Sequence, residues 1–265
     1  MKIGWLSKRY FFLLCISVIL IVVAVIAVFR FSRTKPTYLY VEIKMGQGLW
    51  WAQTAKPSIW FIKALQPGEK EIDLFGKTTA ELLAVRYYPY ESNQYNIFIY
   101  AKIRGSYNKK TNKFLFKNLP IATGAPIELD FPKAQISGSI IDINKQPSND
   151  KSDYKIVYLT KKFANPWEYQ AIKVGDRYFD GVENVFEVIN KETTDTSIIT
   201  PDSFGNMTSE TVEPRNYIII KGRMKLKYKY GQLIYGEDQP VKIYSRLNLF
   251  TERMELTDFL ISAIE

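Results

Sequence analysis

The sequence predicts a mainly β protein in which an N-terminal transmembrane helix precedes two tandem antiparallel, barrel-like β units, each with one short helix. Three observations predict this fold class. Residues 10–29 contain no charged side chain. The rest of the chain alternates apolar and polar residues in short segments that end at Gly, Pro or Asp, which is typical of strands and turns. A set of residues also recurs at a spacing of 107 positions.

The uncharged segment has the length of a membrane-spanning helix. Its 20 residues would rise roughly 30 Å as a helix, the thickness of the hydrocarbon core. The apolar region of a cleaved signal is shorter, about 7–15 residues, so a retained anchor is favoured. We therefore expect residues 1–36 to hold a cytoplasmic tail, a transmembrane helix at about 10–29 and a short tether. Basic residues flank both ends, and only the large C-terminal body favours an extracytoplasmic orientation for that body.

Composition excludes several classes of function. The formal charge is +9, but the first 35 residues hold six Lys or Arg and no acid, so the body carries only +3. A nearly neutral body does not favour nucleic-acid binding. Histidine is absent, and the only cysteine, Cys15, lies in the uncharged segment. This excludes His-based triads, Cys nucleophiles and ordinary zinc sites, so we predict no catalytic residue, no metal, no cofactor and no enzyme activity.

The recurring residues indicate a tandem duplication. Trp60, Gly68 and Asp73 of the first copy match Trp167, Gly175 and Asp180 of the second. The second copy also has the pattern of a capped helix, with Asn165 at the N-cap, Pro166 at N1 and Glu168 at N3. The matches predict a β-rich repeat at 37–143, a linker at 144–152 and a second β-rich repeat at 153–265.

Several local expectations follow from this alignment. We expect Trp60 and Trp167 to lie in the core, Pro126 to be equivalent to Pro240, and both repeats to end in a strand. Asp73 and Asp180 are expected to form turns, which is their commonest use beside Gly. Residues 190–215, which are rich in Ser, Thr and acids, are predicted to be a flexible insertion.

The chain resembles a known family in its arrangement of motifs. A short basic tail, one apolar segment, tandem units with Ala-Ile/Leu-x-x-Gly-Asp/Glu and a later Pro-Ile/Val-x-Leu/Ile are similar to bacterial membrane-anchored proteins classed as a domain of unknown function. The resemblance covers nearly the whole chain. It implies the fold and a location at the cell membrane, and it supplies no catalytic residues.

Two groups of residues are candidates for a binding site. Five cations occupy every second position of one predicted strand: Lys221, Arg223, Lys225, Lys227 and Lys229. They would share one face and form a stripe for an anionic ligand such as lipid headgroups or an anionic polymer, or else a solvated face that prevents edge-to-edge pairing. Trp50 and Trp51 are a candidate aromatic contact with the membrane interface or a partner, or else core residues.

These observations support one hypothesis about function and three alternatives. We expect a non-catalytic, membrane-anchored interaction or scaffold protein of the cell envelope, whose partners are the bilayer and an envelope protein. The alternatives are an export-system adaptor-like component, a module that binds anionic lipid or polymer, and an enzyme that acts on envelope polymer through carboxylates. Nucleic acid is not an expected partner, and the sequence leaves the oligomeric state open.

Overall fold

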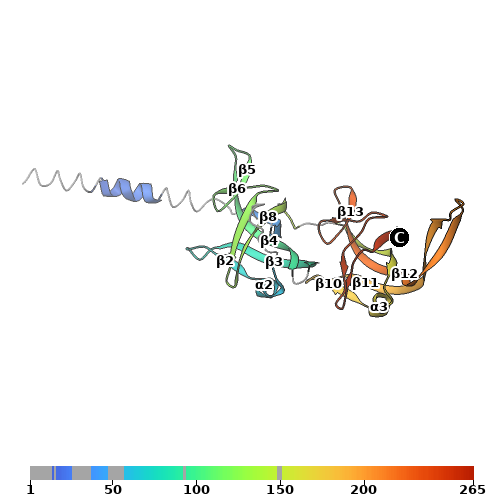
Figure 1. The fold of residues 1–265 in the computed structure, drawn as a ribbon. Coiled ribbons are helices and arrows are strands. Elements are labelled where there is room, and N and C mark those ends of the chain that lie inside the picture. Colours follow the sequence, from blue (N-terminus) through green and yellow to red (C-terminus); the bar gives the residue numbers. More distant parts are fainter. Residues whose placement is uncertain (1–13, 15, 26–36, 47–56, 92–93, 148–150) are drawn as a thin grey trace, which may run out of the picture. The chain divides into compact units, whose positions relative to one another are not determined.

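A computed structural model describes residues 14, 16–25, 37–46, 57–91, 94–147 and 151–265 (Figure 1). The chain divides into two compact units, Met1–Thr37 and Tyr38–Glu265. In the first unit, residue 14 and residues 16–25 are helical. The second unit consists almost entirely of antiparallel strands, so the predicted mainly β, barrel-like body is confirmed.

The predicted transmembrane helix requires a correction. Among the described residues, no helix is both long enough and apolar enough to cross a membrane. The described helical run covers residues 16–25, whereas a span needs about 20 residues. The ends of the predicted segment, at 10–13, 15 and 26–29, lie outside the described residues. A transmembrane helix is therefore not part of the fold class that the structure supports.

The first half of the body is a sheet that curls into a nearly closed barrel (Figure 1). Its elements are β1 (Thr37–Met45), α2 (Ile59–Ala64), β2 (Lys70–Ile72), β3 (Thr78–Glu91), β4 (Gln94–Asn108), β5 (Lys113–Phe116), β6 (Leu119–Ile121), β7 (Pro126–Phe131) and β8 (Ala134–Asn144). Hydrogen-bonded neighbours follow the order β2-β3-β4-β1-β8-β7, and β5 and β6 extend from β4. The two ends of this path meet where the Asp130 backbone N–H donates to Glu71 Oε1 at 3.1 Å.

The second half uses the same order of elements. It contains β9 (Ser152–Ala164), α3 (Pro166–Ala171), β10 (Arg177–Phe179), β11 (Asn184–Pro201), β12 (Met207–Lys229), β13 (Gln232–Tyr235), β14 (Gln239–Pro240), β15 (Leu249–Phe250), β16 (Glu255–Leu256) and β17 (Leu260–Ile264). The neighbours β10-β11-β12-β9-β17 correspond to β2-β3-β4-β1-β8. The same strands are therefore adjacent in both halves.

The register of the strands gives residue-level equivalences between the halves. β3 has a bulge against β4 between Leu82 and Ala84, and β11 has one against β12 between Val188 and Asn190. Gly68 N–H donates to Leu82 O at 2.7 Å in the first half, and Gly175 N–H donates to Val188 O at 2.8 Å in the second. Counting along the strands from these matched bulges, Arg86 and Tyr87 of β3 correspond to Glu192 and Thr193 of β11.

Alternating side chains build one hydrophobic cluster in each half. In β7 the burial alternates strictly, with Ile127, Leu129 and Phe131 inside. In β4, by contrast, Ile97, Phe98 and Ile99 are all buried. Ile97 and Ile99 belong to the cluster of the first half, whereas Phe98 belongs to that of the second. Both faces of β4 are thus covered, which joins the two halves.

Some local predictions are confirmed and others are wrong. Glu168 accepts the backbone N–H of Asn165 at 3.0 Å, as the predicted cap of α3 requires, and the chain ends in a strand, β17. Trp60 and Trp167 are 71% and 60% exposed, so the predicted core position is wrong. A six-residue helix packs one side on the sheet, and in each helix the Trp lies on the other side.

Two further predictions are corrected by strand pairing. Pro240 pairs with Ile234 as Pro120 pairs with Leu115, so the equivalent of Pro240 is Pro120, not Pro126. The insertion predicted to be flexible is a regular hairpin in which residues 197–201 of β11 pair with residues 207–211 of β12. Its polar composition reflects solvent on both sides of a two-stranded ribbon, and it does not prevent pairing.

Candidate functional site

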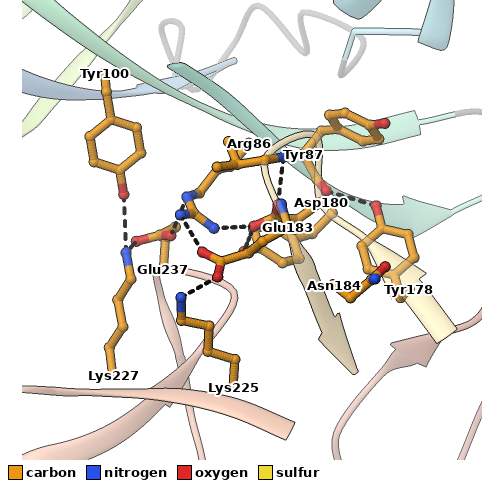
Figure 2. A network of polar contacts seen from close by, with 12 residues as sticks. Arg86, Tyr87, Tyr100, Tyr178, Asp180, Glu183, Asn184, Lys225, Lys227 and Glu237 are labelled. Atoms are coloured by element: carbon orange, nitrogen blue, oxygen red, sulfur yellow. Dashed lines mark hydrogen bonds and ion pairs between the residues drawn. The ribbon is translucent and has the colours of Figure 1, made fainter. Parts of the chain in front are cut away.

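Charged side chains from both halves meet in one group, here called the inter-half ion cluster (Figure 2). Its members are Glu42, Arg86, Asp180, Glu183, Lys225, Lys227, Lys229 and Glu237. Four are cations and four are anions. The cluster lies where β1, β3 and β4 of the first half face β12 and the turn after β10 of the second half.

Arg86 of β3 is the centre of the cluster. Its guanidinium contacts Asp180 Oδ2, lies 2.8 Å from Glu183 Oε1 and places Nε 3.5 Å from Glu237 Oε1. The Asp180 side chain is fully buried. Burial by itself lowers the pKa of Arg86, but the charge of Asp180 and the hydrogen bond to Glu183 outweigh that effect and raise it. Arg86 is therefore permanently charged and holds the second half to the first.

The turn that contains Asp180 is held by hydrogen bonds from its own backbone N–H groups to the Asp180 side chain. Asp180 Oδ1 accepts the N–H groups of Val182 and Glu183, both at 2.9 Å, which is the ordinary turn-forming use of Asp. Its backbone carbonyl accepts the Tyr87 N–H of β3 at 2.9 Å. The predicted turn is thus confirmed, and in addition it docks on the outer edge of β3.

Three lysines of the predicted anionic-ligand stripe belong to this cluster. Lys225 binds Glu183, Lys227 binds Glu237, and Lys229 lies 3.0 Å from Glu42. The remaining two members lie further along β12: Arg223 pairs with Glu187, and Lys221 lies over the Tyr158 ring. The five cations do share one face, but four of them are paired with carboxylates, three of which lie more than 30 positions away in the sequence.

The acids of the cluster differ in their electrostatic balance. Burial raises the pKa of Glu42, the nearby charge of Glu237 adds to the rise, and Lys229 only partly offsets it. Burial also opposes ionisation of Glu183, but hydrogen bonds from Lys225 and Arg86 are stronger and lower its pKa. Tyr100, which donates to Glu42 at 3.0 Å, has a pKa raised by burial and by both glutamates. Of the two cluster carboxylates with a resolved pKa shift, Glu42 is thus protonated more easily than Glu183.

A cavity of about 320 Å³ adjoins the cluster. Glu42, Arg86, Tyr100, Lys225 and Lys227 contribute to its lining. Each of these side chains already contacts a partner of the cluster. These ion pairs and hydrogen bonds link side chains of the first half to side chains of the second half beside the cavity.

The comparisons with known proteins supply no function. No family model, curated protein or solved structure matches the chain. The resemblance to an uncharacterised membrane-anchored family therefore stays a prediction. Trp50 and Trp51, the candidate aromatic contact, lie outside the described residues.

A second feature, which sequence reasoning missed, lies at the tips of two hairpins. The sequence Asp-x-Phe-Gly occurs as Asp73–Gly76 between β2 and β3 and as Asp202–Gly205 between β11 and β12. In both, the Asp Oδ1 accepts the Phe N–H, at 2.9 Å from Phe75 and at 2.8 Å from Phe204. The four-residue repeat was readable in the sequence, but it does not fall at the duplication's spacing.

Both turns hold an aromatic side chain in solvent. Phe75 is 84% exposed and Phe204 is 89% exposed. Further exposed apolar residues flank them: Ile72 and Leu74 at the first turn, and Ile199 and Met207 at the second. Single exposed apolar residues are ordinary, but a group of several exposed apolar residues on one turn is typical of a contact surface.

Proposed function

We propose that this protein is a non-catalytic interaction or scaffold protein whose contacts are made by the Asp73 and Asp202 turns. The observation that carries the proposal is the display of Phe75 and Phe204 in solvent by turns of the same construction. An ordered turn loses little entropy when its side chains bind, so a fixed aromatic residue is an efficient anchor.

The hairpin arm of residues 197–211 gives additional support. Among the residues that the structure describes, its two strands pair only with each other, and Ile198, Ile199, Phe204 and Met207 are all exposed along it. An isolated two-stranded hairpin is marginally stable in water, so an arm of this kind gains from a partner that covers it. The cell-membrane location predicted from the sequence stays a prediction and carries no part of this proposal.

Photo-crosslinking in cells tests the proposal. A photoreactive phenylalanine analogue replaces Phe75 or Phe204 in the full chain, and Tyr244, which is 81% exposed and outside both turns, serves as the matched control. We expect discrete protein adducts from the two turn positions and none of the same adducts from position 244. Absence of adducts at both turns, or identical adducts at all three positions, would contradict the proposal.

A turnover assay addresses the competing enzyme hypothesis. Glu42 and Tyr100 border the cavity and have shifted pKa values, so they are the groups that such an enzyme would use. A Glu42→Gln variant should keep every turn-dependent adduct. We also expect this variant to keep the protein's cellular activity. If that activity is lost although the adducts and the fold persist, the non-catalytic assignment is wrong.

A further inference from the structure

A groove lined by aromatic side chains lies between the two halves and contains no member of the inter-half ion cluster or of the two displayed turns. Its volume is about 490 Å³. One wall comes from the paired ends of β3 and β4, and the other comes from β10 and the β15–β16 hairpin. Most of its lining is aromatic or apolar: Tyr87, Pro89, Tyr95, Phe179, Phe250 and Met254. A groove of this size and composition is typical of a binding site.

The wall supplied by the second half is held in place by hydrogen bonds. In the β15–β16 hairpin, Thr251 Oγ1 accepts the Met254 N–H at 3.1 Å. The Glu252 N–H donates to the Arg177 carbonyl at 3.0 Å, which fixes the hairpin to β10. An ordered wall loses little entropy when a ligand binds, so the groove is prepared for an occupant.

The outer edge of β3 in this groove does not accept another strand. The Tyr87 N–H already donates to the Asp180 carbonyl at 2.9 Å. The Tyr87 carbonyl accepts the Tyr178 hydroxyl at 2.7 Å (Figure 2). The next position that faces outward is Pro89, which has no N–H. A peptide in the groove must therefore bind through rings and hydroxyls, because a ladder of backbone hydrogen bonds is blocked.

The rings in the groove form a ridged surface. The Tyr87 and Tyr95 rings meet edge to face, with centroids 5.8 Å apart and planes at 80°. Such a pair forms a ridge and offers no flat platform on which a planar ligand could stack. Neither hydroxyl has a hydrogen-bond partner among the residues that the structure describes. A polyproline II helix has roughly three residues per turn and no internal hydrogen bonds, so it presents both ridges and unpaired carbonyls.

The charges of the second wall favour a basic ligand. Arg253 Nε lies 3.4 Å from Asp176 Oδ1. Glu252 Oε1 lies 3.8 Å from Arg177 Nε. Glu255 of β16 is exposed, and within the described part of the chain no cation lies at ion-pair distance from it. The lining thus contains one unpaired negative charge, which complements an Arg or Lys of a ligand.

We propose that this groove binds a proline-rich segment of another protein, in the polyproline II conformation and with an Arg or Lys beside its prolines. Aromatic-lined grooves recognise such segments because the helix is already formed and loses little entropy on binding. The inference goes beyond the proposed function, since it uses none of the residues of the Asp73 and Asp202 turns. Because both halves supply walls, an occupied groove also stabilises the contact between the halves.

Peptide binding to the full chain in a non-ionic detergent tests the site. The probes are amidated, fluorescein-labelled peptides: decaproline followed by arginine, decaproline followed by glutamate, and a Gly-Ser peptide of equal length followed by arginine. In fluorescence anisotropy, the arginine decaproline should bind about tenfold more tightly than either of the others. It should also raise the midpoint of thermal unfolding. Equal binding of all three peptides, or no binding of the arginine decaproline, would overturn the proposal.

Substitutions in the groove show whether the peptide occupies it. Tyr95→Phe keeps the ring and removes one hydroxyl, so it should weaken binding of the arginine decaproline about fivefold. Glu255→Lys should reverse the preference between the arginine and glutamate peptides. Glu210→Lys, at an exposed position of the hairpin arm, is the matched charge control and should change neither affinity. If Tyr95→Phe and Glu255→Lys both bind the peptides as the natural chain does, the proposal is wrong.

Discussion

The Asp180 turn and the Asp73 turn use their Asp side chains in the same way and have opposite surroundings. Each Asp accepts two N–H groups of its own turn, so the local sequence determines the turn in both halves. Asp180 is fully buried against Arg86, whereas Phe75 and Leu74 of the other turn extend into solvent. The comparison shows that the same local structure becomes a structural contact or a display surface according to what lies opposite it.

The largest effect is expected where the buried turn loses its cation. An Arg86→Met substitution leaves the buried Asp180 side chain without its cation partner, which we expect to lower the free energy of unfolding by about 3–5 kcal/mol. Urea denaturation of the full chain measures the change. Arg223→Met is the matched control, because the Arg223–Glu187 pair is largely exposed and should contribute only about 0–1 kcal/mol. Equal losses for the two variants would show that the burial of Asp180 does not matter.

Glycine substitution sharpens the comparison between the turns. Gly181 and Gly76 both have positive φ, +102° and +75°, so Ala is strained at either position. Only at Gly181 would the added Cβ meet neighbouring atoms, since nothing lies within 4 Å of a Cβ at Gly76. We expect Gly181→Ala to cost about 1–3 kcal/mol more than Gly76→Ala, measured by thermal and urea unfolding. A smaller cost at Gly181 would mean that the docked turn can shift.

The buried turn should also make stability depend on pH through Glu183. The pKa of Glu183 is lower in the folded protein than its ordinary value of 4.5. Its ion pairs therefore stabilise the fold above pH 4.5, and that stability is lost as the pH falls through the lowered pKa. The urea midpoint should therefore change less between pH 7 and a pH below 4 in the Glu183→Gln variant than it does in the natural chain.

The smallest effect on stability is expected from the displayed aromatics. Phe75→Ser and Phe204→Ser remove exposed side chains and should change the free energy of unfolding by no more than about 0.5 kcal/mol. The same substitution at Phe98, which is fully buried between the halves, serves as the contrast and should cost several kcal/mol, roughly as other core truncations do. A large loss at Phe75 or Phe204 would show that these residues pack within the fold.

Much of the body could be predicted from local patterns. The alternation of β7, the cap of α3 and the repeated Gly-turns each depend on residues within a few positions of one another. The positions of Trp60 and Trp167 were predicted wrongly, because their hydrophobicity suggested burial. Each lies on a six-residue helix that buries only one side, and the Trp is on the other side. The transmembrane helix was likewise predicted from hydrophobicity alone, and among the described residues no helix is long and apolar enough to cross a membrane.

The sequence by itself determined which residues alternate, turn and recur, because these properties arise from φ, ψ preferences and the two-residue period of a strand. It placed five cations of β12 on one face, but not the carboxylates that neutralise them, which come from β1, the turn after β10 and the segment after β13. Only the tertiary structure decided that the Asp180 turn is buried and the Asp73 turn free. The physical reason is that burial and ion pairing depend on groups brought together from distant parts of the chain, and no local pattern encodes that proximity.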